Sequence, residues 1–184
     1  YLYHQHADDI NTHADRALLL DPELGASLMA KGLYYMQTHE FELAVEYFEK
    51  TLRYHPNSAD AYNFLSDIYN LHLPNSMNYL RYALKGIQLD KSAVDSAATS
   101  ISYLHVSNAL IQNGFLNESE TYIKTSLEYD SSNIFSQYVY AYIKLAQNKD
   151  FCRTKELLTE ILMTDTTRLD VLQELAKVHY VLEE

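Results

Sequence analysis

Residues Gly25 to Pro56, GASLMAKGLYYMQTHEFELAVEYFEKTLRYHP, decide the fold. They form two amphipathic stretches joined by a short polar turn, and apolar side chains recur in each at the three- and four-residue spacing of a helix face. Gly32 and Ala44 are the smallest residues of this pattern and fall where two crossing helices would come closest. Pro56 follows the second stretch, where its fixed φ and missing N–H end a helix. The segment therefore predicts a helical hairpin.

Looser copies of this hairpin follow along the chain. Ser66 stands 34 residues after Gly32, and Tyr69 repeats Tyr35 at the same distance. No stretch alternates convincingly between apolar and polar side chains, so no strand is expected. A period near 34 is typical of a helical solenoid, and the alternative is an irregular helix bundle with short loops. The approximate units are 1–22 (partial), 25–58, 59–91, 92–132, 134–167 and 168–184 (partial), all in a single domain spanning 1–184.

Several unit boundaries carry local signals. Asn75 is a candidate N-cap for the helix that follows it. Ser92 is expected to cap a helix that runs to residue 113 and is about two turns longer than its counterparts. Gly114 is well placed to end that helix in the left-handed conformation. Asn117 with Glu120 resembles a capping box, which would open the next helix.

Composition and charge argue against several classes of function. The formal net charge of −11 disfavours binding to a phosphate backbone, because such binding requires clustered Lys and Arg. No apolar run approaches the roughly 18 residues of a membrane helix, and no secretory h-region is present. Cys152 is the single cysteine, so no internal disulfide forms, which fits a reducing compartment. We therefore expect a cytoplasmic protein without nucleic-acid or membrane contact. Its helical pattern runs to the end of the sequence, as in a fragment of a longer protein.

The hairpin of residues 25–56 resembles the tetratricopeptide repeat. That family carries large, small and aromatic residues in its first helix, then Ala, an aromatic and Ala in its second, with Pro at the end. The matching residues here are Leu28, Gly32, Tyr35, Ala44, Phe48 and Pro56. The chain departs from the pattern at Lys31 and Thr51, where apolar residues are usual. The resemblance implies an all-α, right-handed α-α superhelical solenoid of about five hairpins, with the terminal ones incomplete.

In this family the concave surface is made by the first helix of each hairpin. Carried over by position, it implies a groove that binds a protein or peptide segment. Its lining mixes apolar side chains, which adapt to a ligand, with amides, which pair with a peptide backbone. The positions are Met29, Leu33, Met36, Asn63, Asp67, Asn70, Leu104, Asn108, Ile111, Gln112, Val139, Ile143 and Gln147. The competing interpretation is a solvated surface that binds nothing specific.

Two further expectations concern the kind of partner. Relatives that hold the carboxylate tail of a chaperone use Lys and Arg in this groove, whereas Met29, Leu33, Asn63 and Leu104 stand there in this chain. A groove without cations buries a carboxylate at a cost, so acidic C-terminal peptides should bind weakly. The alternative function is a sensory or regulatory repeat region of a multidomain bacterial transcription regulator or nucleotide cyclase, which residues 14–52 loosely resemble.

Chemistry is not indicated. No phosphate-binding loop, nucleophile elbow or metalloprotease helix occurs, so we expect neither an enzyme nor a cofactor. His4, His6 and His13 do not share one helix face, which argues against a metal site. Cys152 stands beside Arg153 but has no evident base or second thiol. The small residues near the start of 92–113 would let another helix approach closely, either within the chain or in a self-associated form.

Overall fold

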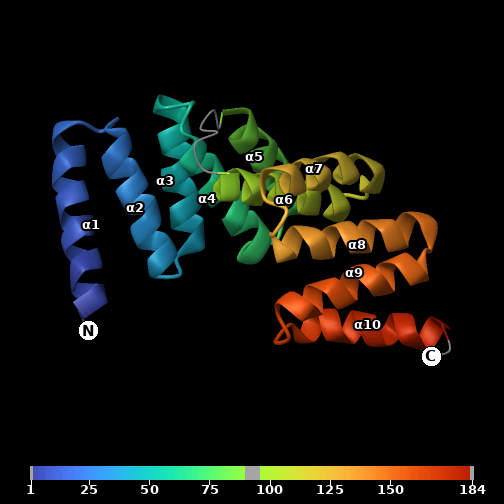
Figure 1. The fold of residues 1–184 in the computed structure, drawn as a ribbon. Coiled ribbons are helices and arrows are strands. Elements are labelled where there is room, and N and C mark those ends of the chain that lie inside the picture. Colours follow the sequence, from blue (N-terminus) through green and yellow to red (C-terminus); the bar gives the residue numbers. More distant parts are fainter. Residues whose placement is uncertain (1, 90–95, 183–184) are drawn as a thin grey trace. The chain divides into compact units, whose positions relative to one another are not determined.

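The computed structural model describes residues 2–89 and 96–182, and side chains from Asp8 onward. The described part is all α-helical (Figure 1). In chain order the helices are α1 (Leu2–Leu20), α2 (Gly25–Gln37), α3 (Phe41–Tyr54), α4 (Ala59–Leu71), α5 (Ser76–Leu89), α6 (Ser96–Gln112), α7 (Leu116–Tyr129), α8 (Ile134–Asn148), α9 (Phe151–Thr164) and α10 (Leu169–Leu182). The prediction of an all-α array of helical hairpins is confirmed.

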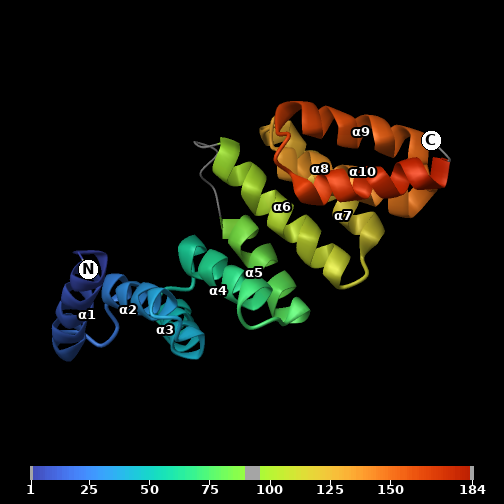
Figure 2. The same ribbon diagram turned by 90° about the horizontal axis from the view of Figure 1, so that it is seen from below.

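The helices pack as successive neighbours. α2 pairs with α3, α4 with α5, α6 with α7 and α8 with α9, while α1 packs on α2 and α10 on α9. Figure 2 shows α6 and α7 as one such hairpin. We call α2, α4, α6, α8 and α10 the A helices, and the others the B helices. Each hairpin thus buries one face internally and another against the next helix, as a repeat architecture requires.

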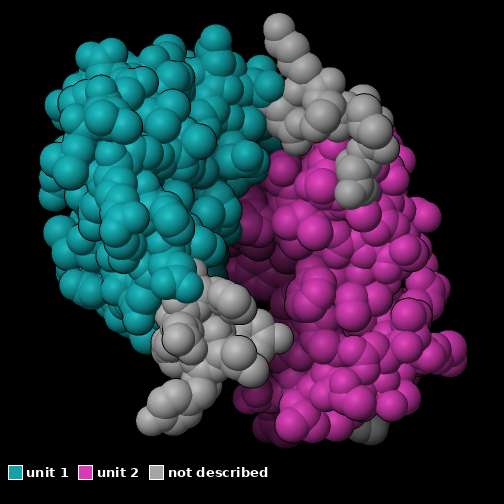
Figure 3. All heavy atoms as spheres, turned by 90° about the vertical axis from the view of Figure 1, so that its left-hand side faces the viewer, with its two compact units in different colours: residues 1–91 teal, residues 92–184 magenta. Residues whose placement is uncertain are grey.

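The chain divides into two compact units, residues 1–91 and 92–184 (Figure 3). The division coincides with the predicted boundary between the units 59–91 and 92–132. Each part has its own core. In the first, Phe48 and Leu65 are fully buried with Ala44, Ile68 and Tyr82 around them. The second holds two clusters, one centred on Ile123 between α6, α7 and α8, the other on Leu158 between α8, α9 and α10.

Three A-to-B turns use the left-handed conformation at one residue. These are His39 with φ 63°, Gly114 with φ 84° and Lys149 with φ 54°. Gly114 was predicted to end its helix in this way, and that prediction is confirmed. The turn between α4 and α5 is longer and contains Pro74, after which the side chain of Asn75 caps α5 by accepting from the backbone N–H of Asn78 at 3.0 Å, as predicted.

Two local predictions for the second unit differ from the structure. The capping box of Asn117 and Glu120 is wrong, because α7 begins at Leu116 after Phe115, which has no capping side chain. α6 is described from Ser96 and spans 17 residues, against 13 in α2 and α4, so the described part is about one turn longer. The predicted cap at Ser92 lies outside the described residues.

Candidate functional site

A small buried residue marks the same place on four A helices. These residues are Gly32, Ser66, Ser107 and Ala141, and each is buried in its hairpin. Ser66 follows Gly32 by 34 residues, and Ala141 follows Ser107 by the same number. If such a residue is at position i of a helix, the residues at i−3, i+1 and i+4 share one face of that helix. We call the surface so defined the helix-A face.

In the first unit this face is made by the predicted residues of α2 and α4. Leu33 is 42% exposed, while Met29 and Met36 are half-buried and pack on the core around Phe48. Asn63 is half-buried and aimed at α5, since a Cβ built on Gly86 would lie 2.5 Å from its Oδ1. The face therefore has an apolar strip on α2 and a more enclosed polar strip on α4.

Asp67 and Asn70 complete the polar strip of α4, and both are half-buried. The carboxylate of Asp67 acts on a neighbour in α5. Burial is the main cause that raises the pKa of Tyr79, and the negative charge of Asp67 raises it further. These polar groups of α4 thus contribute to hairpin packing as well as to the face.

In the second unit, α6 supplies the predicted Leu104, Asn108, Ile111 and Gln112. Leu104 is only 7% exposed and belongs to the core cluster with Ile123 and Ile143, on which Ile111 also packs. Asn108 is half-buried and Gln112 is exposed. α6 therefore gives this face a mostly apolar wall with polar groups toward its C-terminal end.

The predicted positions on α8 need correction. Ile143 is fully buried, and Val139 packs against the same cluster. Gln147 turns toward α7, where its Nε2 donates to Oδ1 of Asn117 at 3.3 Å. Counting from Ala141 places Tyr138, Tyr142 and Leu145 on the helix-A face instead. One residue turns a helix by about 100°, so a small error in register moved the prediction from the face to the packed side.

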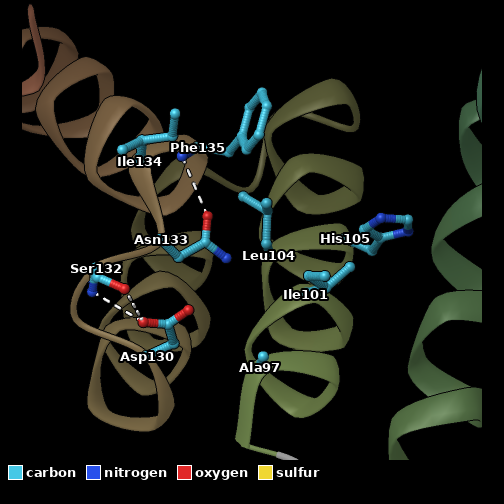
Figure 4. Close-up of a pocket in the computed structure, with 9 residues that line it drawn as sticks. All are labelled: Ala97, Ile101, Leu104, His105, Asp130, Ser132, Asn133, Ile134 and Phe135. Carbon is cyan, nitrogen blue, oxygen red and sulfur yellow. Dashed lines mark hydrogen bonds between the residues drawn. The ribbon is translucent and has the colours of Figure 1, made fainter. Parts of the chain in front are cut away.

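A cavity of about 580 Å³ opens where α6 approaches α8 (Figure 4). One side is formed by α6, with Ala97, Ile101, Leu104 and His105. The other is formed by the start of α8 and the turn before it, with Asp130, Ser132, Asn133, Ile134 and Phe135. Ile101 is 49% and Phe135 57% exposed, so large apolar surface remains accessible at its mouth. The volume is in the range of ligand pockets and accommodates more than one side chain.

The turn at the rim of the cavity is fixed by its own polar side chains. Oδ1 of Asp130 accepts from the backbone N–H of Ser132 at 2.9 Å and from its hydroxyl at 2.6 Å. Oδ1 of Asn133 caps α8 by accepting from the backbone N–H groups of Phe135 and Ser136. These bonds hold Phe135 at the mouth of the cavity.

A buried network of hydroxyl groups lies behind this turn. Ser100, Ser126 and Ser136 are fully buried and come from α6, α7 and α8. The hydroxyl of Ser126 donates to the carbonyl oxygen of Ser100 at 2.7 Å and lies 2.7 Å from Oγ of Ser136. Nδ2 of Asn133 donates to Oγ of Ser100 at 3.0 Å. Small side chains let the helices approach closely, and the hydrogen bonds remove the penalty of burying their polar atoms.

A second hollow, of only about 20 Å³, lies further along the helix-A face and is too small to hold a side chain. It is lined by Tyr138, Tyr142 and Leu145 of α8, Thr154 and Leu158 of α9, and Glu174 and Val178 of α10. Tyr142 is 48% exposed, whereas Tyr138 is half-buried. The face therefore continues from α6 across α8 to α10 within the second unit, as a surface rich in Tyr and Leu.

Side chains that could bind a metal or react elsewhere in the described part of the chain do not form clusters. Among the described residues no three His, Cys, Asp or Glu side chains gather as metal ligands. His13 is exposed, and the side chains of His4 and His6 lie outside the described residues. Cys152 is exposed at the start of α9. None of the described helices is both long enough and apolar enough to serve as a membrane span.

Known proteins share this arrangement of paired helices. No family model matches the sequence, and no curated protein does. Solved structures do match, and they show that the chain has the fold of tetratricopeptide-repeat proteins. PilF of Pseudomonas aeruginosa superposes with a TM-score of 0.76 at 16% identity, over 100% of this chain and 80% of that one.

Two further structures are similar over most of their length. YrrB, a tetratricopeptide-repeat protein with an unusual peptide-binding site, gives a TM-score of 0.74 at 10% identity, over 92% of this chain and 84% of its own. PilW, a type IV pilus biogenesis factor, gives 0.75 at 18% identity, over 100% and 81%. At such identities the similarity establishes the fold.

Proposed function

We propose that this chain is a non-enzymatic protein-interaction module that binds a peptide or helical segment on its helix-A face. The observation that carries the proposal is the cavity of about 580 Å³ between α6 and α8, with Ile101 and Phe135 accessible at its mouth. Accessible apolar side chains around a preformed hollow are the usual anchor site of a protein interface. The peptide-binding site of YrrB, a protein of the same fold, also supports the proposal.

The composition of the face supports a peptide over a small metabolite. Beyond the cavity, α8 adds Tyr138, Tyr142 and Leu145 on the same helix-A face, which offers further contacts to a segment of several residues. Tyr combines apolar area with a polar tip, which suits recognition of a backbone. Asn108 and Gln112 lie on the same side of α6.

The test is selection of binders from a library of random 12-residue peptides displayed on phage, with the 184-residue chain immobilised. An enriched peptide is then labelled, and its affinity is measured by fluorescence anisotropy. Ile101→Glu should weaken binding about tenfold or more, since it places a charge at the anchor site. Met163→Glu is the matched control, because Met163 is 79% exposed on the B helix α9 and should leave the affinity within about twofold. Equal binding to both variants would contradict the proposal.

Two expectations stay predictions beside this proposal. The first is that these residues form a sensory or regulatory region of a bacterial regulator. The sequence of the reading frame on either side of them tests it. Self-association through residues 92–113 is decided by light scattering across a range of concentrations. For the described part of that segment, Thr99 and Ser100 are buried within the second unit, where Ser100 bonds to Ser126 of α7. Packing within the chain therefore accounts for these two small residues.

A further inference from the structure

Some charged side chains near the cavity are already paired with a group of opposite charge, and one is not. Two cations lie on or beside the helix-A face of the second unit. Arg168 forms a bidentate pair with Asp170, at 2.8 and 2.6 Å, and Nζ of Lys177 lies 2.6 Å from Oε1 of Glu174. Both cations are therefore engaged by carboxylates of α10. Asp130 differs, because its Oδ1 accepts only from Ser132.

The second carboxylate oxygen of Asp130 is the relevant group. Within the described part of the chain, Oδ2 of Asp130 takes part in no hydrogen bond or ion pair. Asp130 lines the cavity together with the apolar Ile101, Leu104 and Phe135 (Figure 4). His105 is the other titratable group among the lining residues. An incoming cation thus meets an unneutralised carboxylate at the rim. The guanidinium of Arg168 lies over the ring of Phe135, 4.7 Å from its centroid, but its charge is already paired with Asp170.

Resting on the proposed function, we infer that the bound segment places a Lys or Arg side chain beside Asp130 and an adjacent large apolar side chain between Ile101 and Phe135. The apolar side chain supplies most of the binding free energy by leaving water. The cation supplies selectivity, because a carboxylate at the rim attracts it and repels an acidic segment. The net charge of −11 reinforces this choice by steering cationic partners toward the chain.

The turn offers a matched pair of variants for the test. Asp165 occupies the same place one repeat later, where its Oδ1 accepts from the backbone N–H of Thr167 at 2.9 Å and from its hydroxyl at 2.6 Å. Asp130→Asn and Asp165→Asn each remove one charge and keep an oxygen that can accept from the turn. Asp165 does not line the cavity. The pair therefore separates a local ion pair from the general effect of net charge.

The experiment uses the peptides enriched in the phage selection, with anisotropy measured at low and at physiological salt. We expect Lys or Arg next to Leu, Ile or Phe in the enriched sequences. Asp130→Asn should weaken such a peptide about two- to fivefold, with a smaller effect at higher salt, and Asp165→Asn should not. Replacing the cationic residue of the peptide by Glu should weaken binding to the wild-type chain more than to Asp130→Asn.

The outcomes separate this inference from the proposed function. Enrichment of acidic or uncharged peptides that still depend on Ile101 would overturn the inference alone, and so would equal effects of Asp130→Asn and Asp165→Asn. Binding that does not depend on Ile101, or no enrichment over bare support, would overturn the proposed function and the inference together. Circular dichroism of each variant confirms that the helices remain formed.

Discussion

The ring of Phe48 lies directly against Gly32, so that a Cβ built on Gly32 would stand 2.5 Å from Cε1 of Phe48. The helix crossing in the first hairpin is therefore set by a glycine against an aromatic ring. Sequence reasoning placed Ala44 opposite Gly32, but the nearest side-chain atoms belong to Phe48, one turn further along α3. Phe48 is fully buried and stacks on Phe64 of α4 at 5.2 Å, so it has no room to retreat.

We predict that Gly32→Ala lowers the free energy of unfolding by about 1–3 kcal/mol, because overpacking outweighs the better helix propensity of Ala. Gly25→Ala is the control. A Cβ there meets the exposed ring of His55, which can move aside at the cost of its 2.8 Å contact with the carbonyl oxygen of Glu23. Denaturant unfolding measures both variants. Similar free energies for Gly32→Ala and wild type would mean that α2 and α3 separate at little cost.

A buried lysine connects α1 to α2. Nζ of Lys31 lies 2.8 Å from Oδ1 of Asp15 and donates to Oδ1 of Asn11 at 2.7 Å, beneath the rings of Tyr35 and Tyr47. Burial acts to lower the pKa of Lys31, but the hydrogen bond to Asp15 and the neighbouring negative charges outweigh it, and the pKa is raised. This pairing explains how a charged residue occupies a position where the family has an apolar one.

Asp15→Ala should lower the free energy of unfolding by about 1–2 kcal/mol, because it removes one acceptor of a buried ammonium group. Adding Lys31→Met should recover part of that loss, since Met keeps most of the side-chain volume without the charge. The measurement is a double-mutant cycle by denaturant unfolding. Strict additivity of the two changes would show that Lys31 and Asp15 do not stabilise one another.

The hydroxyl network of the second unit gives a third prediction. Ser126→Ala removes the group that bonds both Ser100 and Ser136, and we expect a loss of about 1–2 kcal/mol. Ser102→Ala is the control, because Ser102 only donates to the carbonyl oxygen of Ala98 within its own helix. Its effect should stay within about 0.5 kcal/mol. If Ser126→Ala and Ser102→Ala changed the stability equally in thermal unfolding, the hydroxyl network would not stabilise this core.

Acid stability should depend on Glu120. Nζ of Lys124 and Nζ of Lys144 each lie 2.6 Å from its Oε1, which joins α7 to α8. Hydrogen bonds from Lys124, Lys144 and Gln147 lower the pKa of Glu120 to about 2. A carboxylate with a lowered folded-state pKa stabilises the fold above its unfolded pKa, and this contribution disappears as the pH falls toward the folded value.

We therefore expect Glu120→Gln to be less stable than wild type at pH 7, by about 1 kcal/mol. The difference should shrink between about pH 4.5 and pH 2, where wild type also becomes neutral at this site. Glu128→Gln removes another carboxylate from α7 and serves as the comparison. A difference that stayed constant down to pH 2 would be inconsistent with a lowered pKa.

Much of the fold followed from the sequence because each hairpin repeats a local pattern. The stretch Gly25 to Pro56 predicted α2 and α3, and the spacing from Gly32 to Ser66 predicted α4 in register. The pattern was less reliable where connections change length. The longer turn around Pro74 moves the buried Tyr79 to 35 residues after Ala44, and α5 therefore repeats α3 one residue late.

The register of the helix-A face followed from the sequence on α2, α4 and α6 but not on α8, and its role in binding stays a prediction. Ala141 indicated the correct register of α8, since it follows Ser107 by 34 residues. Val139 and Ile143 are also apolar, however, and by pattern alone they fitted the helix-A face equally well. Periodicity alone does not say which apolar stripe of a helix is packed and which is free. The cavity itself was not predictable, because Asp130 and Phe135 reach it through a turn whose geometry depends on hydrogen bonds.

The turns at His39 and Lys149 have a consequence for engineering. Both hold a side chain in the left-handed conformation, which costs about 1–2 kcal/mol outside glycine. Gly114 shows that the equivalent turn of another hairpin is made with glycine. His39→Gly and Lys149→Gly should therefore raise the melting temperature, although the greater freedom of glycine in the unfolded chain offsets part of the gain. The helices evidently impose these turns, so a thermostable variant can be sought in the connections while the helix-A face stays unchanged.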